Sequence, residues 1–289
     1  MSGPQVSLLP DGRRLHLQHG PIDVILEAWG EAAEVAAAYR QAAAAFADVL
    51  STLAAELPLL RRPIAAPKPS PEGPVARRMI DAVWPHRSAF ITPMAAVAGA
   101  VADHLLARAA VGSRLERAYA NDGGDIALHL TPGTALTLGM VADIEHPHPD
   151  GTLRIAAADP VRGVATSGRG GRSFSLGIAD AVTVLAASAA AADAAATLVA
   201  NAVDLDHPAI ERRPAVELDP DSDLGELPVT TAVGELGPAA VEAALASGER
   251  EAERLRVAGH VVAVGLWLRG RFRAVGPLSV PTRSAPCPA

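Results

Sequence analysis

Residues 178–203 decide the fold class of this chain, and they read IADAVTVLAASAAAADAAATLVANAV. This stretch is the nearest approach to a membrane span in the sequence, but Asp180 and Asp193 interrupt it and alanine dominates the rest. An aspartate near the centre of a span costs about 2.5–3.5 kcal/mol on insertion scales. We therefore interpret the stretch as a buried strand over 182–185 followed by a buried helix over 189–203, and we expect no contact with a membrane.

Short apolar segments and a few long helices occupy the chain on either side of this stretch. The strands that we expect, the first three as a β-meander, lie at 6–9, 14–18, 22–28, 117–120, 126–130, 135–141, 153–157, 163–166, 260–268 and 272–275. The helices that we expect lie at 31–57, 75–84, 93–110 (after Thr92 as N-cap) and 238–257. Residues 208–237 read as polar and irregular. This order predicts an α+β (mixed α/β) fold in which β-sheets are covered by long Ala-rich helices.

Length and composition restrict the class of protein. Of the 289 residues 49% are hydrophobic, which excludes global disorder, and the one cysteine, Cys287, excludes a disulfide scaffold. The net charge of −7 argues against a nucleic-acid partner. We expect one domain over 1–276 with a Pro-rich loop at 58–74, and a disordered tail at 277–289. The N-terminus lacks a basic start followed by an apolar run, so we expect a cytoplasmic protein.

The first candidate site is the turn at 121–125, NDGGD, between two expected strands. Gly123 and Gly124 can adopt positive φ and let a ligand approach the backbone, while Asn121 and Asp125 supply oxygen acceptors for hydroxyl groups or a cation. Asp-Gly is also among the strongest hairpin signals, so a plain β-turn is the structural alternative. The spacing alone favours the turn and leaves both interpretations open.

The second candidate site is the segment at 165–173, ATSGRGGRS. Its glycines can free backbone N–H groups to form an anion nest, and its two arginines can bind phosphate oxygens in a bidentate manner. It is not a Walker A loop, because the glycine spacing and the lysine are missing. A mobile surface turn is the alternative to a phosphate or nucleotide site. The residues expected to bind the ligand are Thr166, Ser167, Gly168, Arg169 and Arg172.

The third candidate is the pair Asp193 and Thr197, which stand four residues apart in the expected helix and therefore share a face. A carboxylate and a hydroxyl so placed are hard oxygen ligands suited to Mg²⁺, with phosphate oxygens completing the octahedron. Alternatively, Asp193 is an exposed or first-turn aspartate that the helix dipole favours. Its neighbours are so uniformly apolar that we expect a buried helix, in which a carboxylate needs a partner.

Two further features carry weaker signals. His146 and His148 flank a proline in a polar loop, a spacing that is a weak pattern for a transition-metal site. The acidic run at 219–223, DPDSD, reads more readily as a solvated loop than as a cation site. We assign a role to neither.

Four segments, taken in order, resemble the FAD:protein FMN transferase (ApbE) superfamily. They are VAGAVAD at 97–103, NDGGD at 121–125, TSG at 166–168 and ADAAAT at 192–197. Over nearly the whole chain the sequence is also similar to an uncharacterised ApbE-like family, through ITPMAAVAGAVAD, NDGGDIALH, ATSGRGGRSFSLGIADAVTV and DPDSDLG. The resemblance implies an ApbE-like fold in which FAD or a related nucleotide lies in a cleft with Mg²⁺ at its pyrophosphate.

The resemblance also implies roles for individual residues. Asp193 and Thr197 occupy the metal-ligand positions, and residues 166–168 match the loop beside the nucleotide. The glycine-rich turn of the family is matched by Asn121, Gly123, Gly124 and Asp125. In ApbE enzymes the metal assists attack of a target-protein threonine on the FMN phosphate, and AMP is released.

Two departures from the family pattern bear on activity. The family lysine is replaced by Ala98, and the segment H-x-x-D-P-x-T-G by SFSLGIAD at 173–180. Losing one well-placed electrostatic group typically costs about 2.7–4 kcal/mol of barrier. Three functions stay open: a Mg²⁺-dependent nucleotidyl or FMN-type transferase, a non-catalytic cofactor-binding module, and a step in making tetrahydromethanopterin-like cofactors. The expected partner is a small nucleotide or cofactor, and the apolar helices also favour a homodimer.

Overall fold

The computed structural model describes residues 3–140, 151–171 and 173–278. It contains 36% helix and 29% strand, which confirms the predicted α+β fold class. The chain divides into two compact units. The first comprises Met1–Leu136, Ala156–Ala165 and Leu185–Ala194, and the second comprises Thr137–Ile155, Thr166–Val184 and Ala195–Ala289. The prediction of a single domain over 1–276 stays a prediction.

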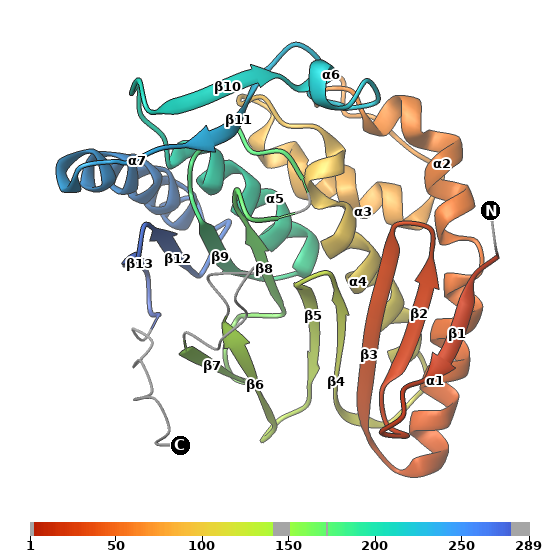
Figure 1. The fold of residues 1–289 in the computed structure, drawn as a ribbon. Helices are drawn as coiled ribbons and strands as arrows, with labels where there is room; N and C mark the ends of the chain where they lie inside the picture. Colours follow the sequence, from red (N-terminus) through yellow and green to blue (C-terminus); the bar gives the residue numbers. More distant parts are fainter. Residues whose placement is uncertain (1–2, 141–150, 172, 279–289) are drawn as a thin grey trace. The chain divides into compact units, whose positions relative to one another are not determined.

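An antiparallel sheet is the framework of the first unit (Figure 1). Its strands, in spatial order, are β1 (Gln5–Leu8), β2 (Leu15–His19), β3 (Ile22–Gly30), β4 (Leu115–Asp122), β5 (Asp125–Leu130) and β8 (Gly163–Ser167). Turns with positive φ at Gly12 and Gly20 join β1, β2 and β3, so the predicted meander is confirmed. The first residues of β8 pair with β5, Gly163 opposite Ala127.

A layer of helices packs on this sheet. Its members are α1 (Ala32–Phe46), α2 (Val49–Leu60), α3 (Pro74–Val83) and α4 (Val97–Ala110), with the 3₁₀ turns η1 (Trp84–His86) and η2 (Pro93–Ala96). The layer packs on the strands through α1, which contacts β2 and β3, and α4, which contacts β3, β4 and β5. Leu17, Val24 and Leu26 alternate along their strands and are fully buried, as are Ala38 and Ala42 of α1. The apolar side chains of the strands, which repeat every two positions, therefore pack in one layer with those of the helix.

The single helix predicted over 31–57 is wrong, because the chain forms α1 and α2 with a bend of 42° between them. Local hydrogen bonds explain the break. The hydroxyls of Ser51 and Thr52 donate to the carbonyl oxygen of Asp48, at 3.0 and 2.8 Å. The Thr52 N–H keeps its ladder bond to the same carbonyl, at 2.9 Å, and such added side-chain bonds to a helix carbonyl often bend the helix.

Two predicted boundaries also differ from the structure. α2 continues through Pro58 to Leu60, so the Pro-rich loop begins three residues later than predicted. Pro58 removes only one backbone donor, and the helix ends soon after it. Thr92 precedes a 3₁₀ turn and makes no side-chain cap, and α4 begins only at Val97. The first turn of α4 is instead satisfied from α5 (Ala189–Ala202), where the carboxylate of Asp193 accepts the Gly99 N–H.

The second unit combines one long helix with short strands. Its strands are β9 (Ala181–Ala186), β12 (Ala263–Leu268) and β13 (Arg271–Val275), paired in that order, and the two-stranded pairs β10 (Ile210–Pro214) with β11 (Pro228–Val233) and β6 (Ala135–Met140) with β7 (Gly151–Ala156). α7 (Pro238–Val257) packs on β12 and β13 and has the predicted bounds. Arg269 and Gly270 both have positive φ, as a tight hairpin requires, so the predicted turn is confirmed.

The prediction that 208–237 is irregular is wrong. This segment contains β10, β11 and the short helix α6 (Ala215–Leu218). A register shift between Glu211 and Arg212 interrupts the alternation that normally identifies a strand. Thr230 of β11 also donates its N–H to the carbonyl oxygen of Ser175, 55 positions earlier in the chain, which no local pattern reveals.

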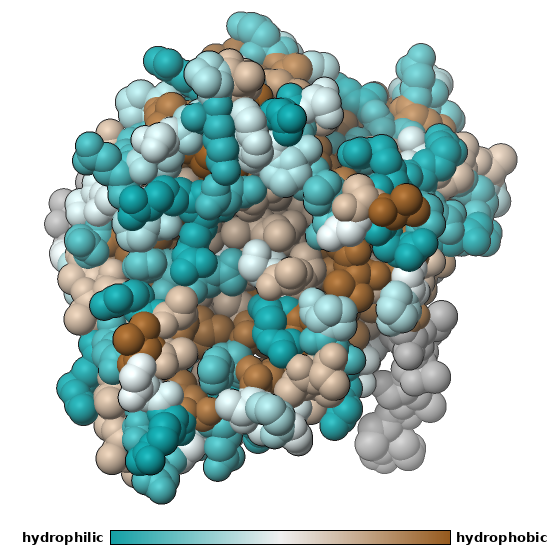
Figure 2. All heavy atoms as spheres, turned by 180° about the vertical axis from the view of Figure 1, so that it is seen from behind, coloured by the Kyte–Doolittle hydropathy of each residue, from teal (hydrophilic) through white to brown (hydrophobic). Residues whose placement is uncertain are grey.

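No single helix in the described residues is long and apolar enough to cross a membrane. α1 and α2 reach the necessary length and apolarity only as a bent pair. On the face drawn in Figure 2, hydrophobic residues form small groups among hydrophilic ones.

Position 99 in α4 accommodates only glycine, because the first turn of α5 (Ala189–Ala202) lies against it. A Cβ on Gly99 would stand 2.3 Å from the carbonyl oxygen of Ala189. Real Cβ atoms do not approach a backbone oxygen so closely, so a larger residue forces the two helices apart.

We expect Gly99→Ala to lower the free energy of unfolding by about 1–3 kcal/mol, the usual cost of overpacking. Urea-induced unfolding measures the effect. Gly139→Ala is the matched control, because nothing lies within 4 Å of a Cβ built there. Equal destabilisation by both substitutions would contradict the close approach of α4 and α5.

Candidate functional site

The N-termini of α4 and α5 are capped by each other's aspartates. Asp103 of α4 accepts the N–H groups of Ala189 and Ala190, at 3.1 and 2.9 Å. In return, Asp193 of α5 accepts the N–H of Gly99 at 3.1 Å through Oδ2. The first N–H groups of a helix have no partner within the helix, and carboxylates satisfy both the hydrogen bond and the positive end of the dipole.

Ser188 completes the cap of α5. Its hydroxyl accepts the N–H of Ala191 at 3.2 Å, and its carbonyl accepts that of Ala192 at 3.0 Å. All four N–H groups of this first turn therefore have acceptors. This matters because Ala189 and Ala192 are fully buried, and an unsatisfied buried donor costs about 1–3 kcal/mol.

The surroundings of Asp193 disfavour its ionised form. Burial raises its pKa well above the ordinary value of 3.8, and the negative charges of Asp125 and Asp122 raise the pKa further. The backbone N–H groups of Gly99 and Ala98 oppose this by stabilising the carboxylate. Three carboxylates from α5, β4 and β5 thus influence one another electrostatically, which is an environment that favours a proton or a cation.

The turn at 121–125 is a two-residue hairpin that positions two of these carboxylates. Asp122 pairs with Asp125 across the end of β4 and β5, and Gly123 and Gly124 have φ of 63° and 112°. The side-chain oxygen of Asn121 accepts the N–H of Gly124 at 2.8 Å. The structural interpretation of this motif as a β-turn is therefore confirmed. The same turn brings Asp125 within electrostatic reach of Asp193.

The loop after β8 belongs to the second unit. Gly168 has φ of 147°, and a Cβ there would stand 2.6 Å from the carbonyl oxygen of Asp180. Arg169 donates its N–H to Ala179 at 2.8 Å, and its guanidinium lies 3.4 Å from the Asp180 carboxylate. Gly171 donates its N–H to Gly168 at 3.1 Å. Two of the backbone N–H groups proposed for an anion nest are thus used inside the loop.

The hydroxyl of Thr166 forms a 2.8 Å hydrogen bond with that of Thr183, a buried residue of β9. Thr197 is half-buried on α5.

The predicted site residues that fall in the first unit are Asn121, Gly123, Gly124, Asp125 and Asp193. Those that fall in the second unit are Thr166, Ser167, Gly168, Arg169 and Thr197. Arg172, His146 and His148 lie outside the described residues.

The acidic run at 219–223 forms a turn after α6. Asp219 accepts the N–H of Asp221 at 2.9 Å and that of Ser222 at 3.0 Å, and the first three residues of the run are exposed.

Within the part of the chain that the structure describes, no group of three or more His, Cys, Asp or Glu side chains is arranged to hold a metal ion alone. A cation at Asp193 would need further ligands such as water, hydroxyl or phosphate oxygens.

Sequence reasoning missed another carboxylate with unusual surroundings, Glu27 on β3. It is 5% exposed and accepts hydrogen bonds from the Arg13 guanidinium, at 2.6 Å, and from the Tyr119 hydroxyl, at 3.3 Å. Burial and the negative charge of Glu27 raise the pKa of Tyr119 to about 12. The partners of Glu27 come from distant parts of the chain, so no local pattern identifies this carboxylate.

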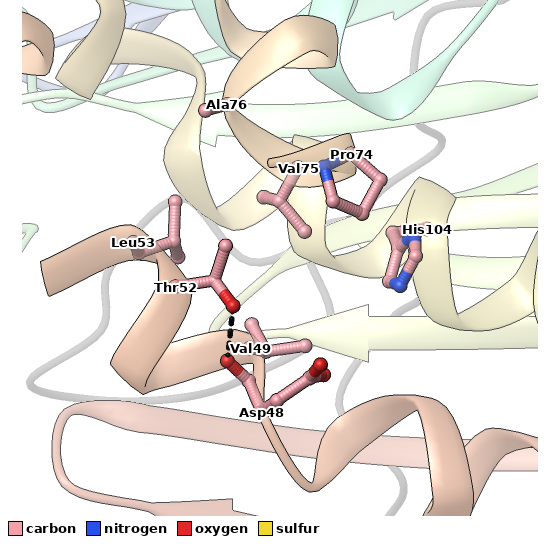
Figure 3. Close-up of a pocket in the computed structure, with 8 residues that line it drawn as sticks. All are labelled: Asp48, Val49, Thr52, Leu53, Pro74, Val75, Ala76 and His104. Atoms are coloured by element: carbon pink, nitrogen blue, oxygen red, sulfur yellow. Dashed lines mark hydrogen bonds between the residues drawn. The ribbon is translucent and has the colours of Figure 1, made fainter. Parts of the chain in front are cut away.

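A small cavity in the first unit lies among α2, α3 and α4 (Figure 3). Asp48, Thr52 and His104 line it together with apolar side chains of α2 and α3, and its volume is about 30 Å³. That volume holds about two water molecules and excludes a nucleotide. Burial, and then the positive charges of Arg78 and Arg108, lower the pKa of His104.

The family of the chain follows from comparison with known families. A family model described as AbpE bacteria matches residues 6–274, so the chain belongs to that family. No curated protein matches the sequence.

The raised pKa of Asp193 predicts how stability depends on pH. The folded protein binds a proton at this carboxyl more tightly than the unfolded chain does, so the ionised form costs stability, and the cost appears as pH rises from 3.8 through the raised pKa. Asp193→Asn removes the charge and keeps an oxygen that can accept the Gly99 N–H.

In a chelator, we expect the melting temperature of Asp193→Asn minus that of the wild type to increase between about pH 5 and about pH 8. A gain of a few degrees is expected, since about 1 kcal/mol corresponds to roughly 2–4 °C at this size. Thermal melts across this range measure it. A difference that does not change with pH would contradict the electrostatic interpretation.

The next prediction concerns Asp103, which caps α5, and the free energy of unfolding. Asp103→Ala leaves the N–H groups of Ala189 and Ala190 without their acceptor, and we expect a loss of about 1–3 kcal/mol in unfolding free energy. Asp103→Asn, which retains one oxygen, should lose less. If urea unfolding gives both variants the wild-type stability, the cap does not stabilise α5.

Proposed function

We propose that this protein binds a flavin or related nucleotide, with FAD as the leading candidate, and that Mg²⁺ at the pyrophosphate is held by Asp193 and Thr197. The nucleotide-binding residues are Asn121, Gly123, Gly124, Asp125, Thr166, Ser167, Gly168, Arg169 and Arg172. The resemblance of four segments to ApbE proteins supports this assignment. We place the protein in the cytoplasm.

The electrostatics of Asp193 carry the proposal. Its ionised form is disfavoured by burial and by the charges of Asp125 and Asp122, so a divalent cation relieves both costs when it binds. Oδ2 accepts the Gly99 N–H, which orients the carboxylate on α5. Hard oxygen donors are the ligands that Mg²⁺ prefers, and Mg²⁺ commonly takes one or two carboxylates and completes its shell with water and phosphate oxygens.

Bound Mg²⁺ would neutralise charge on the phosphates of the nucleotide. The chain's own residues orient the ligands. The Gly99 and Ala98 N–H groups at the start of α4 favour the carboxylate form of Asp193. Arg169 supplies a guanidinium for phosphate oxygens, which requires it to exchange its 3.4 Å contact with Asp180 for the ligand.

A non-catalytic binding module is the second candidate, and a specific observation favours it. Ala98 stands where ApbE enzymes carry a lysine, and residues 173–180 lack the histidine, proline and threonine of the family segment. The Ala98 position contributes a backbone N–H to Asp193 in place of a side-chain cation. Binding of the nucleotide therefore has more support than transfer of FMN.

Ligand binding should appear as thermal stabilisation. We expect FAD with Mg²⁺ to raise the melting temperature of the wild type, since a ligand at 100 times its Kd contributes about 2.7 kcal/mol. In Asp193→Asn the Mg²⁺-dependent part of the shift should disappear. Asp221→Asn, in an exposed turn, removes the same charge and should keep the shift.

Two results would overturn this assignment. One is no shift with FAD, FMN, ATP or a pterin at millimolar concentration. The other is an unchanged Mg²⁺ dependence in Asp193→Asn. AMP release from FAD, followed by chromatography and abolished in Asp193→Asn, would identify a transferase, whereas binding without AMP release identifies the module.

A further inference from the structure

A basic segment lies in the first unit of this acidic protein. Residues 61–90 contain six Lys or Arg and only two Asp or Glu, whereas the whole chain has 25 Lys or Arg against 32 Asp or Glu. This segment forms the loop after α2, helix α3 and the turn η1, and all of it belongs to the first unit. The surplus of positive charge in this segment attracts anionic groups.

Four side chains of this segment make a defined surface, which we call the basic patch: Lys68, Arg77, Trp84 and Arg87. The Arg87 guanidinium lies 4.6 Å from the centre of the Trp84 ring, and Lys68 Nζ lies 5.9 Å from it. Arg87 also donates to the carbonyl oxygen of Trp84 at 3.1 Å. Both cations are thus held at one aromatic side chain.

Arg77 extends the basic patch along α3. Residues 77, 81 and 84 share one helix face, and Arg77 is exposed on it. Asp81 lies between the cations and binds Lys68 at 2.6 Å, with 67% of its side chain exposed. Three cations against one carboxylate leave the basic patch positive, and this exposed ion pair can exchange partners at little cost.

The loop that carries Lys68 is anchored at both ends. Ile64 donates its N–H to the carbonyl oxygen of Ile91 at 2.9 Å. At the other end, the Glu56 carboxylate of α2 accepts the N–H groups of Glu72 and Gly73, at 2.6 and 3.1 Å. Both ends of the loop that carries Lys68 are therefore held, which reduces the entropy lost when a partner binds.

From these observations we propose that the basic patch is a docking surface for an acidic, extended peptide segment of a partner protein. Charge complementarity identifies the class of partner. The seven steps from Arg77 to Trp84 rise by roughly 10 Å along the helix. An extended peptide advances about 3.3 Å per residue, so carboxylates about three residues apart match the spacing of these cations. The exposed cations suit a row of carboxylates, and half-buried Trp84 offers apolar contact to the peptide between them.

The test uses the full-length protein and a fluorescently labelled synthetic peptide of Asp and Glu, about eight residues long. We expect binding at low ionic strength and its loss in about 1 M salt, where the Debye length is about 3 Å. Arg87→Glu should weaken binding about tenfold or more. Arg250→Glu makes the same charge change on an exposed residue of α7 and should alter the affinity by less than about twofold.

Tryptophan emission gives an independent readout of the site. Peptide binding should change the emission of the wild type, and Trp84→Phe should abolish this change while Trp29 and Trp267 still emit. Failure of the peptide to bind, or equal weakening by Arg87→Glu and Arg250→Glu, would overturn the proposal. So would a preference for phosphatidylserine vesicles or a single-stranded oligonucleotide over the peptide.

Discussion

The exchange of caps between α4 and α5 is the interaction on which the first unit depends. Asp103 satisfies the N–H groups of Ala189 and Ala190, and Asp193 satisfies that of Gly99. Both helix starts are buried among small side chains, where water cannot replace a missing acceptor. The close approach that allows both bonds requires glycine at position 99, because a Cβ there would strike the backbone of α5. The two caps, the close packing of α4 on α5 and the absence of a side chain at position 99 therefore depend on one another.

The same exchange of caps places Asp193 where its ionised form costs free energy. The carboxylate of Asp193 at the N-terminus of α4 gains from two backbone N–H groups, but its half-buried position and the charges of Asp125 and Asp122 disfavour ionisation. The opposing effects leave a pKa well above the ordinary value, so burial outweighs the helix terminus. Asp103 shows the milder case, in which burial raises the pKa and two N–H groups restrain it. A group that is costly to ionise alone is well suited to hold a cation, which connects the fold to the proposed Mg²⁺ site.

Local patterns predicted the elements whose causes are local. The meander β1–β3, helix α7 and the hairpin at Arg269-Gly270 follow from alternation, helix propensity and turn residues, and the structure confirms them. The break between α1 and α2 depends on side-chain bonds to one carbonyl, Asp48, within a stretch without Gly or Pro. β10 and β11 escaped prediction because a register shift disrupts their alternation and one partner, Ser175, is distant in sequence. The late start of α4 has its cause in α5.

The sequence by itself determined the α+β class and singled out the turn at 121–125 and Asp193 as residues with unusual requirements. An Asp among alanines and a Gly-Gly turn are local facts, and they hold wherever the rest of the chain lies. Only the tertiary structure decided what those residues contact: that Asn121 holds its own turn, that Asp193 caps a helix 94 positions earlier in the chain, and that Glu27 is buried beneath Arg13 and Tyr119. The physical reason is that the pKa of a carboxyl group inside the protein, and its affinity for a cation, depend on the groups around it. Those groups are assembled by folding from segments that are far apart in the sequence.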